Sequence, residues 1–199
     1  LMNTKSQKNI ELELKVLNKI DQSENLSQRI ISRDLNVALG LANSLVKKFV
    51  KKGFLKLKEA PLKRYFYYLT PKGILEKTKL TKEYIETSLL FFKKAKEEYE
   101  EELQKTKKTK KIIIICGITD FTDIAVLASK IQDIKIDFIY ARKDKRESYC
   151  GIKILHNLDS IKEKKKIHIL IADSREIKRI NIKKNNFSIF KPKSLMDIL

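Results

Sequence analysis

The stretch Leu26–Leu75 carries the pattern that most constrains the fold. Ser27 suits a helix N-cap, and a short helix ending near Asp34 is predicted by the apolar spacing of Leu26, Ile30 and Ile31. A second helix is predicted between Ala38 and a C-cap at Gly53, because apolar residues recur there at helical spacing: Leu41, Leu45, Val46, Phe49 and Val50. Two such helices separated by a turn predict a helix-turn-helix.

A β-hairpin is predicted directly after this helix pair. The segments FLKLK and RYFYYLT are rich in aromatic residues and are joined by a short loop that contains a proline. Thr70 and Pro71 then predict the start of a new helix, since proline at the first helical position removes no needed donor. An amphipathic segment at residues 9–21 predicts a helix that supports the pair from behind. Residues 1–70 are therefore predicted to form an α+β winged helix.

A long helix is predicted over residues 71–104. It carries an apolar stripe with partial heptad spacing, formed by Ile85, Leu89, Phe92, Ala95, Tyr99 and Leu103. We expect this stripe to form a homodimer interface, which suits the two-fold symmetry of palindromic operators. The alternative is that the stripe packs on the C-terminal part of the same chain. The lysine-rich residues 105–111 are predicted to be a basic linker.

The order of these elements resembles that of the MarR-type winged helix-turn-helix transcription regulators. The residues that carry the resemblance are KKGF after the second helix, the aromatic hairpin, and YYLTPKGILEKTKLT at Tyr67–Thr81. The last motif is similar to one found in the exopolysaccharide-associated subgroup. The resemblance covers roughly Ile10–Leu103, about half of the chain. It implies binding to double-stranded DNA and regulation of polysaccharide or cell-envelope genes.

The expected DNA-binding residues form three groups. Residues at or near the start of the second helix are expected closest to the bases: Asn36, Ala38, Gly40, Asn43, Ser44 and Lys47. Asn43 suits an adenine edge because an amide donates and accepts together, and the alternative is a merely solvated side chain. Expected phosphate contacts are Ser27, Gln28, Arg29, Arg33, Lys47 and Lys48. The wing adds Lys56, Lys58, Lys63 and Arg64, each of which has the alternative of a solubilising surface charge.

The charge of the chain agrees with a polyanionic partner. There are 44 basic and 25 acidic side chains, a net charge of +19, which favours phosphate contacts and counterion release. Residues 1–70 carry 14 basic and 6 acidic side chains, whereas residues 112–199 carry 18 and 11. The excess per residue is therefore highest in the predicted winged helix.

Residues 112–199 predict a separate α/β domain, which makes the chain multidomain. The run IIIICG is typical of a buried parallel strand, and strands then alternate with short helices. This predicts a small Rossmann-like parallel sheet of four or five strands, with a ligand at the carboxyl ends of the strands. The candidate ligand-binding residues at that edge are Gly117, Thr119, Asp120, Phe121 and Arg142. Only the first glycine of GxGxxG is present, which disfavours ordinary dinucleotide binding.

The pattern ICG..DF..IA.LA, followed by CGIKIL, resembles small nucleotide-sugar or CoA-type Rossmann-like modules, similar to those of bacterial sugar acyltransferases. The resemblance implies a nucleotide or nucleotide-sugar effector at the first loop. The alternative is a domain that only stabilises the dimer.

No catalytic or metal-binding set is evident around His156, His168, Cys116 and Cys150, and we predict that the chain is not an enzyme. The apolar runs are too short to span a membrane and no leader is evident, which predicts a cytoplasmic, nucleoid-associated protein. The expected function is that of a homodimeric DNA-binding transcription regulator with a nucleotide-responsive module. The alternatives are a Rex-like nicotinamide redox-sensing repressor and an enzyme of nucleotide-sugar metabolism.

Overall fold

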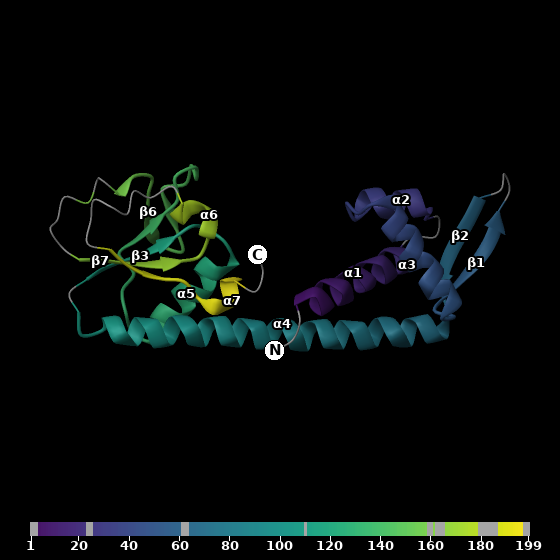
Figure 1. Cartoon of the computed structure of the whole chain (residues 1–199), viewed down its shortest axis with the longest axis horizontal. Helices are drawn as coiled ribbons and strands as arrows, with labels where there is room; N and C mark the ends of the chain where they lie inside the picture. The colour runs from purple at the N-terminus through teal and green to yellow at the C-terminus, as the bar shows by residue number, and fades with distance from the viewer. Residues whose placement is uncertain are drawn as a thin grey trace. The chain divides into compact units, whose positions relative to one another are not determined.

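The computed structural model describes residues 4–22, 26–60, 64–109, 111–158, 161, 166–178 and 187–196. The chain divides into two compact units, the N-terminal unit (Leu1–Leu89) and the C-terminal unit (Leu90–Leu199). Figure 1 shows the elements of each unit. The division lies within one continuous helix, α4 (Pro71–Thr106), and not at the predicted linker. The predicted long helix therefore forms, and it ends at Thr106, inside the segment expected to be the linker.

The N-terminal unit consists of helices followed by a hairpin, and then the first part of α4. Its elements are α1 (Thr4–Asp21), α2 (Gln28–Asp34), α3 (Leu39–Lys51), β1 (Leu55–Ala60) and β2 (Arg64–Leu69). Strand β1 pairs with β2 in antiparallel register, as the hairpin prediction required. Helix α1 supports the α2–α3 pair, since its residues Leu14, Val16, Leu17 and Ile20 are buried in the same core as Ile31, Leu45, Val46 and Phe49.

Thr70 joins three elements of this unit. Its hydroxyl donates to the carbonyl oxygen of Gly53 at 2.6 Å and accepts from the backbone N–H of Gly73 at 3.0 Å. Its own N–H donates to the carbonyl oxygen of Phe54 at 3.0 Å. The predicted cap at Thr70 therefore also ties the start of α4 to the end of α3. Gly73 permits this approach, because a Cβ there would lie 2.1 Å from the Phe54 carbonyl oxygen.

The C-terminal unit is built on a six-stranded sheet in the order β5-β6-β4-β3-β7-β8. All neighbouring strands are parallel except β5 and β6, so the predicted parallel sheet has an additional antiparallel edge strand. The strands are β3 (Ile112–Cys116), β4 (Phe138–Tyr140), β5 (Ser148–Tyr149), β6 (Ile152–Leu155), β7 (Ile167–Ile171) and β8 (Phe187–Phe190). The helices after them are α5 (Asp120–Ile131), α6 (Ser174–Ile177) and α7 (Lys193–Met196).

The C-terminal part of α4 belongs to the core of this unit. Ala95, Tyr99 and Leu103 are fully buried together with α5 and one face of the sheet. The Tyr99 hydroxyl donates to the carbonyl oxygen of Ile171 at 2.6 Å, and burial raises the pKa of this side chain. The dimer prediction is therefore wrong for these three residues, since they pack on the same chain. The rest of the predicted stripe is exposed: Ile85 (51%), Leu89 (57%) and Phe92 (37%).

His168 of β7 is buried next to three polar side chains, Ser188, Lys111 and Glu102. The His168 side chain is 3% exposed, and its Nδ1 forms a hydrogen bond of 2.7 Å with Ser188 Oγ. Ser188 Oγ accepts a hydrogen bond from Lys111 Nζ at 3.2 Å. His168 Nε2 lies 3.2 Å from Glu102 Oε1, but the two do not form a hydrogen bond. Burial lowers the pKa of His168, with Lys111 and Lys105 acting in the same direction and Glu102 opposing them. The folded state therefore favours neutral His168.

Gly73→Ala should destabilise the N-terminal unit. The new Cβ would clash with a backbone carbonyl, which cannot rotate away, and we expect a loss of about 1–3 kcal/mol in the free energy of unfolding. Gly40→Ala is the matched control, because its Cβ would meet nothing within 4 Å. That helical substitution should instead stabilise by about 0.5–1 kcal/mol. Urea unfolding followed by circular dichroism measures both, and equal effects would contradict the packing argument.

His168 should make stability fall as the pH is lowered. Above its ordinary value of 6.5, His168 is neutral whether the chain is folded or unfolded. Below 6.5 the unfolded chain gains a proton that the folded one resists, so stability is lost until the pH reaches the lower folded-state pKa. Unfolding of the wild type and His168→Gln should therefore diverge below pH 6.5, by up to about 1.4 kcal/mol per pH unit. Parallel pH profiles would contradict this assignment.

Candidate functional site

Helix α3 presents a polar face to solvent. Its buried side chains are Ala42, Leu45, Val46 and Phe49. With about 100° between successive residues, the opposite face holds four residues, all exposed: Gly40, Ser44, Lys47 and Lys51. Two positions predicted to be apolar core are on the surface instead, Leu41 at 44% exposure and Val50 at 37%. The buried face is centred between Leu45 and Val46, which places these two residues on its flanks.

The expected base-reading residues differ in how they are presented. Asn36 is exposed and has a left-handed φ of 51°, which fits the turn between the helices. Ala38 is the N-cap of α3 and supplies no side-chain cap. Asn43 lies on a flank, half-buried, and its Oδ1 is buried without a hydrogen-bond partner among the described residues. Of the residues expected to read bases, Gly40 and Ser44 are therefore more accessible to another molecule than Asn43.

Several of the expected phosphate contacts are engaged within the protein. Lys48 forms an ion pair with Glu13 of α1. Arg33 lies 3.2 Å from Asp34, whose pKa is lowered by hydrogen bonds from Lys19 and then Arg33. On α2, the Gln28 amide donates to the Tyr67 hydroxyl at 2.8 Å, and the Ser27 hydroxyl accepts from Ile30 N–H at 3.3 Å. These side chains have structural roles at the expected interface.

Other basic residues have no ion-pair partner among the described residues. Two were expected, Arg29 on α2 and Lys47 on α3, and both are exposed. Lys51 was missed, although its spacing of four residues from Lys47 places it on the same helix face. On β1, Lys56 and Lys58 are exposed and alternate, so they share one face of the hairpin. The side chain of Arg64 is not described, and Lys63 lies outside the described residues.

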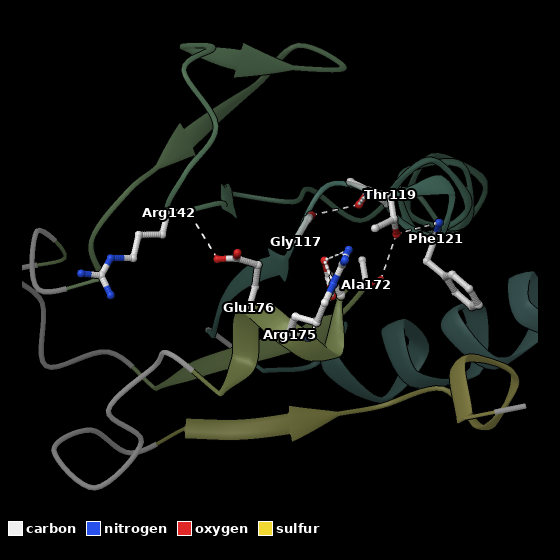
Figure 2. A network of polar contacts seen from close by, with 9 residues as sticks. Gly117, Thr119, Phe121, Arg142, Ala172, Arg175 and Glu176 are labelled. Carbon is white, nitrogen blue, oxygen red and sulfur yellow. Dashed lines mark hydrogen bonds and ion pairs between the residues drawn. The ribbon is translucent and has the colours of Figure 1, made fainter. Parts of the chain in front are cut away.

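The second candidate site lies where β3 and β7 end side by side (Figure 2). Gly117 follows β3 with a φ of 101°, and its N–H donates to the Tyr140 carbonyl oxygen at 2.8 Å. A Cβ at Gly117 would lie 2.4 Å from the Cβ of Asp173, in the loop after β7. The glycine therefore allows this second loop to lie directly against the first.

The start of α5 is capped by its own side chains. Thr119 Oγ1 accepts from the Phe121 N–H at 3.2 Å and donates to the Ala172 carbonyl oxygen at 2.9 Å. The Thr119 N–H donates to Thr122 Oγ1 at 3.0 Å. Two backbone donors that a phosphate would use are thus already satisfied. Phe121 is buried and stacks edge-on against Phe91 at 5.8 Å, which makes it a core residue.

Carboxylates surround this second site. Asp173 pairs with Arg175 at 2.8 Å, and Glu176 accepts from the Arg142 backbone N–H at 3.4 Å. The Arg142 guanidinium is exposed and points away from Gly117 in Figure 2. Burial, followed by Glu176 and Asp173, raises the pKa of the Cys116 thiol to about 12. Gly117 and Thr119 therefore lie together as expected, with Asp120 exposed beside them, but the surrounding charges do not favour an anionic ligand.

Asp173, Arg175 and Glu176 were not expected at this site. They follow a different strand, and the sequence does not show that β3 and β7 are neighbours in the sheet.

In the part of the chain that the structure describes, no three His, Cys, Asp or Glu side chains gather to hold a metal, and no helix is long and apolar enough to span a membrane. No protein-family model matches the sequence, and no curated protein matches it.

Proposed function

We propose that the chain is a DNA-binding transcription regulator whose N-terminal unit binds duplex DNA as a winged helix. The observation that carries the proposal is the charge on the exposed face of α3. Lys47 and Lys51 lie there without ion-pair partners among the described residues, whereas neighbouring Lys48 is paired with Glu13. Lys56 and Lys58 on β1 extend the basic surface to the wing. Phosphate contacts from both elements would set the register of α3 in the major groove.

The order of elements supports the winged-helix assignment. Two short helices pack on each other, a supporting helix precedes them, and an antiparallel hairpin follows. The resemblance of YYLTPKGILEKTKLT to the exopolysaccharide-associated MarR-type regulators extends the proposal to polysaccharide or cell-envelope genes.

We assign the C-terminal unit a regulatory role as a Rossmann-like domain. From β3 the chain passes to β4 and β6 on one side, and β7 and β8 lie on the other side. Successive strands are thus added first on one side of β3 and then on the other. This change of direction is typical of doubly wound sheets, which bind ligands at the point where the strand order reverses. A nucleotide-type effector would require the Asp173 loop to move away from Gly117. The occupied donors of Thr119 and Phe121 disfavour the Rex-like alternative, and equally any nucleotide effector held there by its pyrophosphate, since a pyrophosphate needs such N–H groups.

The proposed regulator is a homodimer formed through α4. Ile85 and Leu89 are exposed on the face of α4 opposite Leu80, which lies in the N-terminal core. Ile74 lies on the same face as Ile85, at helical spacing. A second copy of this helix would cover these side chains and give the two-fold symmetry that suits a palindromic operator.

Lys47→Ala should lower DNA affinity and reduce the slope of log affinity against log salt by about 0.9, because one phosphate contact is lost. Lys48→Ala is the matched control. Its charge is neutralised by Glu13, so it should leave the slope nearly unchanged. Fluorescence anisotropy of the full chain with a labelled duplex, across a salt series, measures both slopes. Equal slopes for the two variants and the wild type would contradict the proposed interface.

Ile85→Glu combined with Leu89→Glu should convert a dimer into a monomer, because four carboxylates would have to be buried in the interface of two copies. Leu90→Glu is the control, since Leu90 is 63% exposed but lies about 140° around the helix from Ile85. Sedimentation equilibrium gives the mass of each protein. A wild type that stays monomeric at all concentrations would contradict the dimer proposal.

A further inference from the structure

The first turn of α3 exposes two large apolar side chains. Leu39 is 41% exposed and Leu41 is 44% exposed. They lie about 100° to either side of Gly40, which is at the centre of the exposed face. A Cβ at Gly40 would meet nothing within 4 Å, so the surface between the two leucines is open. The two leucines therefore flank a position where another molecule can approach the backbone closely.

This end of α3 offers few polar groups for reading bases. The helix contains no arginine, and the Asn43 Oδ1 is buried. Lys47 lies about two turns beyond Gly40, and Lys51 lies a further turn away. Ser44 is the remaining exposed polar side chain of α3 near the first turn, and the exposed amide of Asn36 lies before the helix, in the preceding turn. A bidentate hydrogen bond to guanine or adenine, which needs arginine, lysine, asparagine or glutamine, is therefore not available from the first turn.

An apolar side chain can still discriminate between bases in the major groove. Thymine is the only one of the four bases that presents a methyl group there, on C5, and apolar side chains contact it. Burying this methyl group against a leucine removes apolar surface of both molecules from water. The residues nearest the base edges in such a helix are those of its N-terminal turn.

We propose that Leu39 and Leu41 read thymine through its 5-methyl group, so that α3 selects A·T base pairs from the major-groove side. This inference rests on the proposed DNA binding and adds the class of target sequence. Gly40 allows the helix backbone to come close to the bases, and each leucine would then contact the groove on its own side of Gly40. Lys47 and Lys51 hold the phosphates further along the helix.

The test compares duplexes that differ only in the methyl group. Anisotropy is measured for the full chain with a duplex of mixed A·T pairs and with the same duplex carrying deoxyuridine in place of every thymidine. A second pair compares a G·C duplex with its 5-methylcytosine form, which places a methyl group at the same position in the groove. Affinity should fall about fourfold for each thymine methyl that loses a leucine contact, and it should rise when cytosine is methylated.

The variant Leu39→Ala/Leu41→Ala should bind thymine and uracil duplexes equally and keep the wild-type salt slope. Val50→Ala is the matched control, because Val50 is also an exposed apolar residue of α3, at 37%, but lies at the other end of the helix. Val50→Ala should keep the discrimination. Circular dichroism verifies that each variant is folded.

Salt-dependent binding with equal affinity for thymine and uracil duplexes would overturn this inference and leave the proposed function intact. Discrimination that persists in Leu39→Ala/Leu41→Ala would also overturn it. Failure to bind any duplex at low salt would instead overturn the proposed DNA binding on which the inference rests.

Discussion

The hydrogen bonds of Thr70 are the constraint on which the N-terminal unit depends. Through them a single residue holds the end of α3, the loop before β1 and the first turn of α4 in fixed positions. The missing side chain of Gly73 lets α4 begin directly against the Phe54 carbonyl group. The placement of the hairpin beside α3 follows from this junction. In the proposed DNA complex, this arrangement would let the basic residues of both elements contact one stretch of DNA backbone.

Sequence reasoning predicted elements well where the signal was local. The start of α4 followed from Thr70 and Pro71, and the buried strand β3 followed from its unbroken apolar run. Prediction from the sequence was less successful where a residue's burial depends on a partner far away in the chain. Ala95, Tyr99 and Leu103 have the spacing of a dimer stripe, but the sheet of the C-terminal unit covers them. Periodicity shows that a helix face is apolar and does not show what covers it.

At the candidate sites, too, local features could be predicted from the sequence and contacts between distant residues could not. The exposed lysines of α3 could be predicted from helix geometry, but the pairing of Lys48 could not, because Glu13 is 35 positions away in the sequence. Asp173 meets Gly117 only because β7 pairs with β3. Leu41 was expected in the core because a 3.6-residue period allows a wide apolar stripe. The face of α3 that is buried in the core is narrower than that stripe and leaves Leu41 exposed.

The ion pairs of the N-terminal unit have a consequence for the proposed regulator and its search for a binding site. Lys15, Lys19, Lys48 and Lys77 are each paired with a carboxylate within this unit. In the proposed complex with DNA, these four lysines would release fewer counterions than the count of 44 basic side chains suggests. Weaker attraction to random sequence would shorten each nonspecific contact of the proposed regulator, so that it would dissociate sooner and sample another segment. Internal neutralisation thus favours rapid scanning over tight nonspecific attachment.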